Sequence, residues 1–385
     1  MSRKLLATAV ALAVALACPT AFAAKHVYPD DYASPQAAID AAGPGDTVVI
    51  ADDWSGSIQV ADKSNLRIIG KKKATLSGGP AGEILNIVDS EKIQVRDLIL
   101  KSAAENGVTV RFSEDVLLKG LLVDGTIEHG IAVGSSTGVT IQQCEVMSAG
   151  DDGINMDRDL TGTPPSMCVV TRCEISGVGD DGIDITGGDC VVEKNRVTNV
   201  GACGINLDEN ALGAIEVTKN RVSVCGDFGI RMTSVDHSVT KNRVERTGDD
   251  GIYVDTDGCL IEKNRVDDSA EDGIDIEGDG NRIEKNTIRD TAFDSIDADG
   301  DQNRFVKNKV TGGNQGVDVS GDGNIFEKNS FTRHGEYGII VSSGVGNRFT
   351  KNKAKQSGLQ DIWTVVPAGE NTWEKNKFKT GNAPD

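Results

Sequence analysis

Residues 263–276 read Lys263-Asn264-Arg265-Val266-Asp267-Asp268-Ser269-Ala270-Glu271-Asp272-Gly273-Ile274-Asp275-Ile276, and variants of this stretch recur along the chain. The Lys-Asn pair returns in steps of 21 to 25 residues, at Lys194-Asn195, Lys219-Asn220, Lys241-Asn242, Lys263-Asn264, Lys285-Asn286, Lys307-Asn308, Lys328-Asn329 and Lys351-Asn352. A Gly-Ile or Gly-Val pair alternates with it and continues upstream as far as Gly107. A repeat of about 22 residues predicts a solenoid in which each coil carries at least two short strands.

The strand after each Gly shows which side chains point inward. The residue after the Gly is Ile or Val, and the residue two positions further on is also apolar. The residue between them is mostly polar, as expected for a strand with one face toward solvent. This outward column contains Asn155, Asp184, Asn206, Arg231, Tyr253, Asp275, Asp297 and Asp318.

The same alternation places the Asn of each Lys-Asn pair inside the solenoid. A buried amide needs hydrogen-bond partners, and identical side chains on coils about 4.8 Å apart can bond to one another and to the turn backbone. A second column, five residues earlier, is expected to do the same: Asn281, Asn303, Asn324, Asn347 and Asn371.

Four segments are expected along the chain. Residues 1–23 have a basic start, an apolar run and an Ala21-Phe22-Ala23 cleavage pattern, which predicts a signal peptide and export to the periplasm or the extracellular space. Residues 24–79 form the N-terminal cap and first coils, with a capping helix that begins after Ser34. Residues 80–376 form the repeats, and residues 377–385 form a C-terminal tail. No other run is long and apolar enough to span a membrane.

Composition and net charge limit the classes of molecule that the protein is expected to bind. The chain has 45 Gly, only 4% aromatic residues and a formal net charge of −19, which becomes −21 if Arg3 and Lys4 leave with the signal peptide. Such a charge argues against nucleic acid and anionic membranes as partners. The negative charge instead favours metal cations as ligands. For the oligomeric state, we expect a monomer.

Seven of the eight cysteines would remain after cleavage of the signal peptide. Cys168 and Cys190 share one column on adjacent coils, and Cys144 and Cys173 share another. Each pair is either a disulfide or two stacked core thiols.

The N-terminal region adds a family resemblance. Ala38-Ile39-Asp40-Ala41-Ala42-Gly43-Pro44-Gly45-Asp46-Thr47-Val48, followed by Asn65-Leu66-Arg67-Ile68-Ile69-Gly70 and the Asn and Gly-Ile ladders, resembles the pectin-lyase-like right-handed parallel β-helix superfamily. The resemblance covers nearly the whole mature chain and implies an all-β solenoid of 12–14 coils. The superfamily contains lyases, hydrolases, epimerases and non-catalytic proteins, so the fold alone names no reaction.

Two coils are longer than the repeat and carry paired acids. Extra residues follow Asn155 and Leu207, and insertions on a solenoid usually mark its working face. Residues 150–157 and 179–184 read Gly-Asp-Asp-Gly-Ile-Asn-Met-Asp and Gly-Asp-Asp-Gly-Ile-Asp. Carboxylates at this density suit calcium. The expected ligands are Asp152, Asp157, Asp180, Asp181 and Asp184.

The Gly-Asp-Asp-Gly-Ile-Asp turn also resembles the calcium-binding turn of the family 9 pectate lyases. The resemblance implies that Asp180, Asp181 and Asp184 hold the ion, with Asp157 or Asn155 contributing from the coil before. It places the catalytic base on the outward column at Asn206 or Arg231. That family uses Lys, whereas this chain offers Arg231, which is hard to deprotonate.

The resulting hypothesis is a calcium-dependent lyase that cleaves an acidic polysaccharide by β-elimination. Arg231 is the candidate base, and Asn206 and Tyr253 are candidate substrate-binding residues. His129 is interpreted as a turn residue.

Two other interpretations remain open. Gly248-Asp249-Asp250-Gly251 repeats the acidic turn on a regular coil, so the motif can be turn chemistry in a non-catalytic carbohydrate-binding or surface protein. A glycoside hydrolase would use a pair of outward acids such as Asp275, Asp297 and Asp318.

Overall fold

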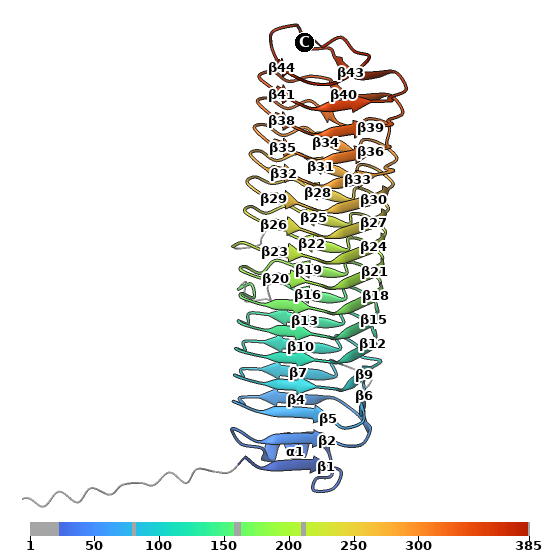
Figure 1. Cartoon of the computed structure of the whole chain (residues 1–385). Helices are drawn as coiled ribbons and strands as arrows, with labels where there is room; N and C mark the ends of the chain where they lie inside the picture. Colours follow the sequence, from blue (N-terminus) through green and yellow to red (C-terminus); the bar gives the residue numbers. More distant parts are fainter. Residues whose placement is uncertain (1–22, 79–81, 158–162, 209–212, 384–385) are drawn as a thin grey trace, which may run out of the picture.

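The computed structural model describes residues 23–78, 82–157, 163–208 and 213–383. The described chain is a right-handed solenoid of parallel strands, stacked from the N-terminal end to the C-terminal end (Figure 1). Each coil contributes one strand to each of three sheets, which run the length of the molecule. The predicted all-β parallel β-helix is confirmed. The expected signal peptide falls almost entirely on residues 1–22, outside the described residues, so export stays a prediction.

Sheet A has 16 strands. They are β1 (Lys25–Tyr28), β2 (Thr47–Ile50), β5 (Arg67–Gly70), β8 (Gln94–Arg96), β11 (Leu117–Lys119), β14 (Thr140–Gln142), β17 (Val169–Thr171), β20 (Val191–Glu193), β23 (Glu216–Thr218), β26 (Ser238–Thr240), β29 (Leu260–Glu262), β32 (Arg282–Glu284), β35 (Arg304–Val306), β38 (Ile325–Glu327), β41 (Arg348–Thr350) and β44 (Thr372–Glu374).

Sheet B has 14 strands. They are β3 (Trp54–Ser55), β6 (Thr75–Ser77), β9 (Ile99–Lys101), β12 (Leu122–Thr126), β15 (Glu145–Ala149), β18 (Glu174–Val178), β21 (Arg196–Val200), β24 (Arg221–Cys225), β27 (Arg243–Thr247), β30 (Arg265–Ser269), β33 (Thr287–Arg289), β36 (Lys309–Thr311), β39 (Ser330–Thr332) and β42 (Lys353–Lys355).

Sheet C also has 14 strands. They are β4 (Ile58–Ala61), β7 (Leu85–Val88), β10 (Val108–Arg111), β13 (Ile131–Gly134), β16 (Ile154–Met156), β19 (Ile183–Ile185), β22 (Ile205–Leu207), β25 (Ile230–Met232), β28 (Ile252–Val254), β31 (Ile274–Ile276), β34 (Ile296–Ala298), β37 (Asp318–Val319), β40 (Tyr337–Val341) and β43 (Gln360–Thr364).

The strand order gives 14 complete coils, with β1 and β44 as additional strands at the two ends of sheet A. This count matches the upper end of the 12–14 coils expected. Strand β4 pairs with β7 across residues 79–81, so the solenoid continues over the boundary placed at 79 and 80. Lys377 and Gly381 form bridges with the last coil, so part of the expected tail continues the stack.

The short helix α1 (Pro35–Ala41) lies at the N-terminal end of the stack (Figure 1). Ser34 is its N-cap and accepts a hydrogen bond from the Ala37 N–H over 3.1 Å, and Pro35 occupies the first turn, where it removes no helical hydrogen bond. Ala38 and Ile39 are fully buried. The predicted capping helix is confirmed, and it shields the end of the apolar interior from water.

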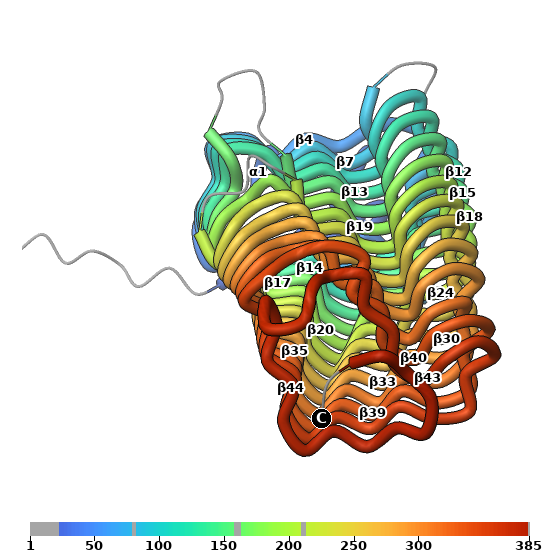
Figure 2. The backbone as a smooth tube through the Cα atoms, turned by 90° about the horizontal axis from the view of Figure 1, so that it is seen from above, coloured from blue at the N-terminus to red at the C-terminus, as the bar shows by residue number. Residues whose placement is uncertain are grey.

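The interior is a column of thin apolar slices rather than one large core. Seen from above, successive coils follow the same outline, each displaced a little from the one before (Figure 2), so that equivalent side chains stack. Phe305 and Phe326 lie with ring centroids 4.5 Å apart, Phe326 and Phe349 at 4.9 Å, and Phe349 and Trp373 at 4.1 Å. Each coil therefore buries its apolar residues against the coils above and below it.

The predicted asparagine column is confirmed at the corner between sheets A and B. Asn264 is 1% exposed. Its Nδ2 donates to the Val239 carbonyl (2.8 Å) and to Asn286 Oδ1 (3.2 Å). Its Oδ1 accepts from the backbone N–H of Asn242 over 2.9 Å. The second column repeats this pattern at the corner between sheets C and A, where Asn281 Oδ1 accepts from the Cys259 N–H over 2.7 Å.

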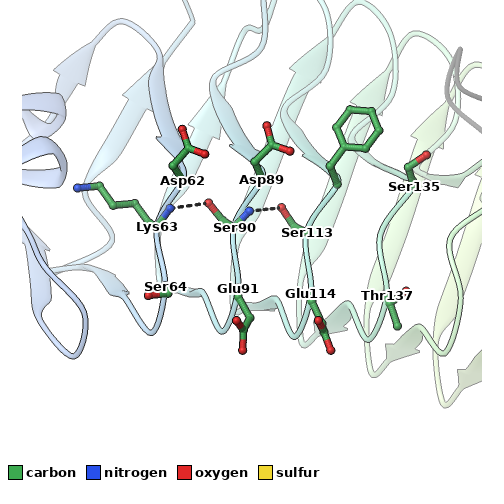
Figure 3. A pocket seen from close by; sticks show the side chains of 11 residues that line it. Asp62, Lys63, Ser64, Asp89, Ser90, Glu91, Ser113, Glu114, Ser135 and Thr137 are labelled. Atoms are coloured by element: carbon green, nitrogen blue, oxygen red, sulfur yellow. Dashed lines mark hydrogen bonds between the residues drawn. The ribbon is translucent and has the colours of Figure 1, made fainter.

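In the first coils, serine hydroxyls bond to the turn backbone between sheets C and A, three residues before the position that corresponds to Asn281. The backbone N–H of Lys63 donates to Ser90 Oγ over 3.1 Å, and the N–H of Ser90 donates to Ser113 Oγ over 3.2 Å (Figure 3). An open depression of about 730 Å³ runs along this corner. Small hydroxyls thus accept turn N–H groups from the neighbouring coil, as amides do at a nearby turn position further along.

Seven cysteines lie in the described residues, and all are free and buried. Cys168 and Cys190 stack on adjacent coils, as do Cys144 and Cys173, and each pair interacts through its sulfur atoms. The structure therefore has stacked core thiols at both positions where a disulfide was the alternative.

Replacing a corner asparagine should cost more stability than replacing its exposed neighbour. We expect Asn264→Ala to lose roughly 1–3 kcal/mol, because it leaves buried groups on two neighbouring coils without partners. Arg265→Ala removes an ion pair between Arg265 and Asp267, two partly exposed side chains, and should cost less than about 1 kcal/mol. Thermal and urea denaturation would measure both losses, and equal losses would contradict the ladder's role.

Candidate functional site

The predicted site residues lie on sheet C and on the turns that lead into its strands. Register places Asn155, Asp184, Asn206, Arg231 and Tyr253 side by side on five consecutive strands, β16, β19, β22, β25 and β28. We call this run the strand row. All five side chains are half-buried. The outward direction predicted for this column is confirmed.

A second run, the turn row, is formed by the residue directly before each sheet C glycine. Asp152 Oδ1 accepts the Asp181 N–H over 2.9 Å, and Asp181 Oδ1 accepts the Cys203 N–H over 2.7 Å. On regular coils Asp250 Oδ1 accepts the Asp272 N–H over 2.7 Å. The second acid of each double-acid turn is therefore part of the fold, as the turn-chemistry interpretation holds, and the other oxygen of Asp152 accepts a hydrogen bond from Asn155 in the strand row.

Asp184 lies at the centre of the predicted calcium site. Asn206 Nδ2 donates to its Oδ1 over 3.0 Å, and Asn155 Nδ2 donates to its Oδ2 over 3.5 Å. Asn155 Nδ2 also donates to Asp152 Oδ2 over 2.8 Å. Two amides thus join the carboxylates of Asp152 and Asp184 into one network that spans three coils.

The carboxylates of this network are held in an unfavourable environment. Burial raises the pKa of Asp181 to about 6, and repulsion from Asp152 and Asp180 adds to the effect. Burial and the nearby Asp152, Asp181, Asp208 and Asp157 raise the pKa of Asp184 to about 8. The pKa of Asp180, in the exposed part of the turn, is raised for the same reasons. A cation bound here would lower these values.

Asn206 adds an oxygen that has no partner. Its Oδ1 is buried without a hydrogen bond, although its Nδ2 is bonded to Asp184. A buried carbonyl oxygen without a donor is costly, and a cation would satisfy it. The oxygens of Asp152, Asp181, Asp184 and Asn206 are the ligand type that calcium prefers, so the residues fit the ion.

Asp157 lies directly after strand β16, two residues beyond Asn155 of the strand row. Its Oδ1 accepts a hydrogen bond from the Thr186 hydroxyl over 2.7 Å. Asp157 and Asp208 each stand directly before an insertion, and residues 158–162 and 209–212 of these insertions lie outside the described residues. The structure brings Asp157 close enough to raise the pKa of Asp184, as Asp208 does on the next coil.

The sequence analysis interpreted His129 only as a turn residue, and the structure also places it beside two carboxylates. Its Nδ1 accepts the Asp152 N–H over 3.3 Å, which confirms the turn role. The same atom lies 3.2 Å from Asp152 Oδ2 and 3.6 Å from Asp151 Oδ2. Burial disfavours the charged imidazolium, but Asp152 and Asp151 outweigh it and raise the pKa of His129.

His129, Asp151 and Asp152 also bring three possible ligand atoms within 4.8 Å of one another. Of the five predicted metal ligands, only Asp152 belongs to this group. A depression of about 210 Å³ opens beside it, lined in part by Arg111, His129, Asn155 and Asp157. Arg111 was missed in the sequence because it stands two positions beyond the outward column, at the end of β10.

Arg231 follows Asn206 in the strand row, and Tyr253 follows Arg231. Within the described residues, Arg231 has no hydrogen bond and no ion pair, so its guanidinium is available to a ligand. Tyr253 stacks on Phe228 with ring centroids 4.9 Å apart. One face of the Tyr253 ring is thereby covered, and the role of Tyr253 in binding a sugar stays a prediction.

Carboxylates continue along sheet C beyond Tyr253. Burial and mutual repulsion raise the pKa of Asp275 and of Asp297 to about 8, and Asp250, Asp272 and Asp294 are shifted in the same direction. A high density of acidic residues therefore does not by itself distinguish the candidate site from the rest of sheet C. The network around Asp184 differs by its two amides, its unpartnered oxygen and the nearby Arg231.

Family models match the chain over residues 85–237, 159–289 and 272–384, each time as a right-handed β-helix region. The chain belongs to the right-handed β-helix family. Among proteins with curated functions, none matches this sequence. No helix in the described part of the β-helix protein has the length and apolar character needed to cross a membrane.

Solved structures show the same fold at low sequence identity. PfbA, a surface adhesin of Streptococcus pneumoniae, is 12% identical with a TM-score of 0.54, over 89% of this chain and 91% of PfbA. The A-module of the Azotobacter vinelandii mannuronan C-5 epimerase AlgE6 is 14% identical with a TM-score of 0.50, over 91% and 94%. Pectate lyase Pel9A is 13% identical with a TM-score of 0.48 over 55% of this chain, which spans 64% of Pel9A.

The raised pKa values of the β-helix protein predict how its stability depends on pH. Folded Asp181 and Asp184 hold protons that the unfolded chain, with a carboxyl pKa of 3.8, has released. Stability is therefore highest at low pH and falls as pH rises from about 4 to 8. In EDTA, Asp184→Asn should reduce this fall by on the order of 1 kcal/mol, and the exposed Asp30→Asn should not. Thermal melts across this range would measure it, and a rise in stability with pH would contradict it.

Proposed function

We propose that the protein is a calcium-dependent polysaccharide lyase that cleaves a uronate polymer by β-elimination. One observation carries the proposal: Arg231, without a partner among the described residues, stands directly beside Asn206 and the carboxylate network of Asp184. A uronate unit needs both elements, a cation for its carboxylate and a base for the hydrogen on carbon 5.

The proposed ion-binding residues are Asp181, Asp184 and Asn206, with Asp152 and Asp157 from the preceding coil. Asp180 completes the predicted set from the exposed part of its turn. A calcium ion bound there would neutralise the sugar carboxylate and make the hydrogen on carbon 5 more acidic. It would also offset the repulsion that this acidic face exerts on an anionic polymer.

The chain's own residues would carry the remaining steps. Arg231 is the proposed base, and its guanidinium must release a proton to solvent before it can take the proton from carbon 5. The electron pair left behind forms the double bond between carbons 4 and 5, and the glycosidic bond at carbon 4 breaks. The departing oxygen takes a proton from water. The amides of Asn155 and Asn206 hold Asp184 in place, and Tyr253 borders the next subsite.

The environments of the downstream acids argue against a hydrolase. A glycosidase needs one protonated acid and one ionised carboxylate. The pKa values of Asp275 and Asp297 are both raised to about 8, by the same burial and mutual repulsion. Carboxyls that repel each other titrate as a pair, and no hydrogen bond or ion pair among the described residues assigns the acid role to one of them and the base role to the other. A non-catalytic carbohydrate-binding protein remains the main alternative, and the activity test below separates it.

Calcium should raise the melting temperature through this site. At about 100 times its Kd, a ligand that binds only the folded state adds about 2.7 kcal/mol. We expect Asp181→Ala to remove most of this rise. Asp250→Ala is the matched control, because Asp181 and Asp250 each accept one turn N–H over 2.7 Å and so lose the same structural bond. An unchanged calcium response in Asp181→Ala would refute the site.

Arg231→Ala should abolish product formation while the protein stays folded. The loss of a positioned base typically costs about 10²–10⁴ in rate. The assay follows the ultraviolet absorbance of unsaturated uronates, with calcium, on pectate, alginate and other polyuronates, and chelation should stop it. Arg265→Ala, on sheet B, is the control. If the wild type yields no unsaturated product on any of these polymers, the lyase proposal fails and the binding role takes its place.

A further inference from the structure

A basic groove lies on sheet B near the C-terminal end. It has a volume of about 640 Å³ and crosses the strands β33, β36, β39 and β42. Its lining includes five cations and one acid: Arg289, Lys309, Arg333, Lys353, Lys355 and Asp290. A patch of this sign is unexpected in a chain with 59 acidic and 40 basic residues.

Register arranges the groove as two rows, each of which combines cations with hydroxyls. Lys309, Ser330 and Lys353 stand side by side in the first row. The second row begins at Arg289, passes through two threonines and ends at Lys355. Because neighbouring strands lie about 4.8 Å apart, the second row is roughly 14 Å long. This length suits a short stretch of a polymer that carries repeated charges and hydroxyls.

The cations of the groove differ from those on the coils before it. There, Arg243 is paired with Glu245 over 2.7 Å and Arg265 with Asp267 over 2.5 Å. None of the five groove cations has an ion pair among the described residues. Five cations with a single acid, Asp290, among them repel one another, so the groove is arranged for an anion from outside the chain.

We infer that this groove binds an anionic polysaccharide, which carries carboxylate or sulfate groups. Serine, threonine and Gln356 between the cations can bond sugar hydroxyls. The lining has no aromatic side chain on which nucleic acid bases could stack, and no apolar side chain that would enter a lipid surface. The groove lies on sheet B, whereas the acidic network lies on sheet C, so this inference does not depend on the proposed lyase activity.

The test measures binding by the full chain in EDTA, which removes any contribution from a calcium site. Affinity electrophoresis or calorimetry would compare polygalacturonate, chondroitin sulfate, neutral dextran and single-stranded oligothymidine. We expect both acidic polysaccharides to bind and dextran not to bind. About 1 M sodium chloride should abolish binding, because it shortens the screening length to about 3 Å.

Lys309→Ala combined with Lys353→Ala should raise the Kd for the acidic polysaccharides roughly tenfold. Arg67→Ala combined with Arg348→Ala removes the same charge from exposed positions on sheet A and should leave the Kd within about twofold of the wild type. Equal effects of the two double variants would overturn the site. Equal binding of dextran would overturn the charge argument, and tighter binding of oligothymidine would overturn the assignment to a polysaccharide.

Discussion

The structure depends on how each coil satisfies the backbone at its corners. Between strands the chain turns, and its N–H groups lose the regular pairing that sheets provide. Side chains of the neighbouring coil supply the missing acceptors. Asparagine does so between sheets A and B, as Asn264 does for Asn242. Aspartate does so between sheets B and C, as Asp181 does for Cys203. Asparagine and serine do so between sheets C and A.

The choice of aspartate at one corner has electrostatic consequences for the whole of sheet C. A carboxylate accepts hydrogen bonds as well as an amide does, but it also brings a charge. Stacked at one corner and joined by Asp184, Asp275 and Asp297 on the strands, these charges raise one another's pKa values. The fold alone would be served equally well by amides, as the other two corners demonstrate. The acids therefore serve the turn through their hydrogen bonds, and a bound cation is the proposed use of their charge.

The turn row is interrupted where the candidate site lies. Cys203 and Phe228 replace the acids on two consecutive coils, and Arg231 stands on the strand that follows Phe228. This interruption leaves Arg231 without the ion pair that a turn aspartate would offer. The basic groove on sheet B also lies where the repeat loses its acids. Glu245 and Asp267 pair with Arg243 and Arg265 on earlier coils, and the coils of the groove lack such acids. On a regular solenoid, candidate functional sites are found where residues depart from the type that is usual at their position in the repeat.

The sequence by itself determined the solenoid, its coil count, the capping helix and both asparagine columns. A repeat of about 22 residues lets each position be compared with its copies, so inward and outward directions follow from alternation alone. It also brought Asn155, Asp184, Asn206, Arg231 and Tyr253 into one row, and register confirms this row.

Only the tertiary structure decided which of these residues lack partners. Hydrogen bonds between coils join residues that are 21 or more positions apart in these ladders, and side-chain rotamers decide them. Contacts of this kind determine three features: the Asn206 oxygen has no hydrogen-bond partner, His129 lies beside Asp151, and the thiols are free. The basic groove also depends on the tertiary structure, because its cations come from four coils and only stacking places them together. Periodicity shows where side chains point, whereas burial and contact between coils determine their charge and chemistry.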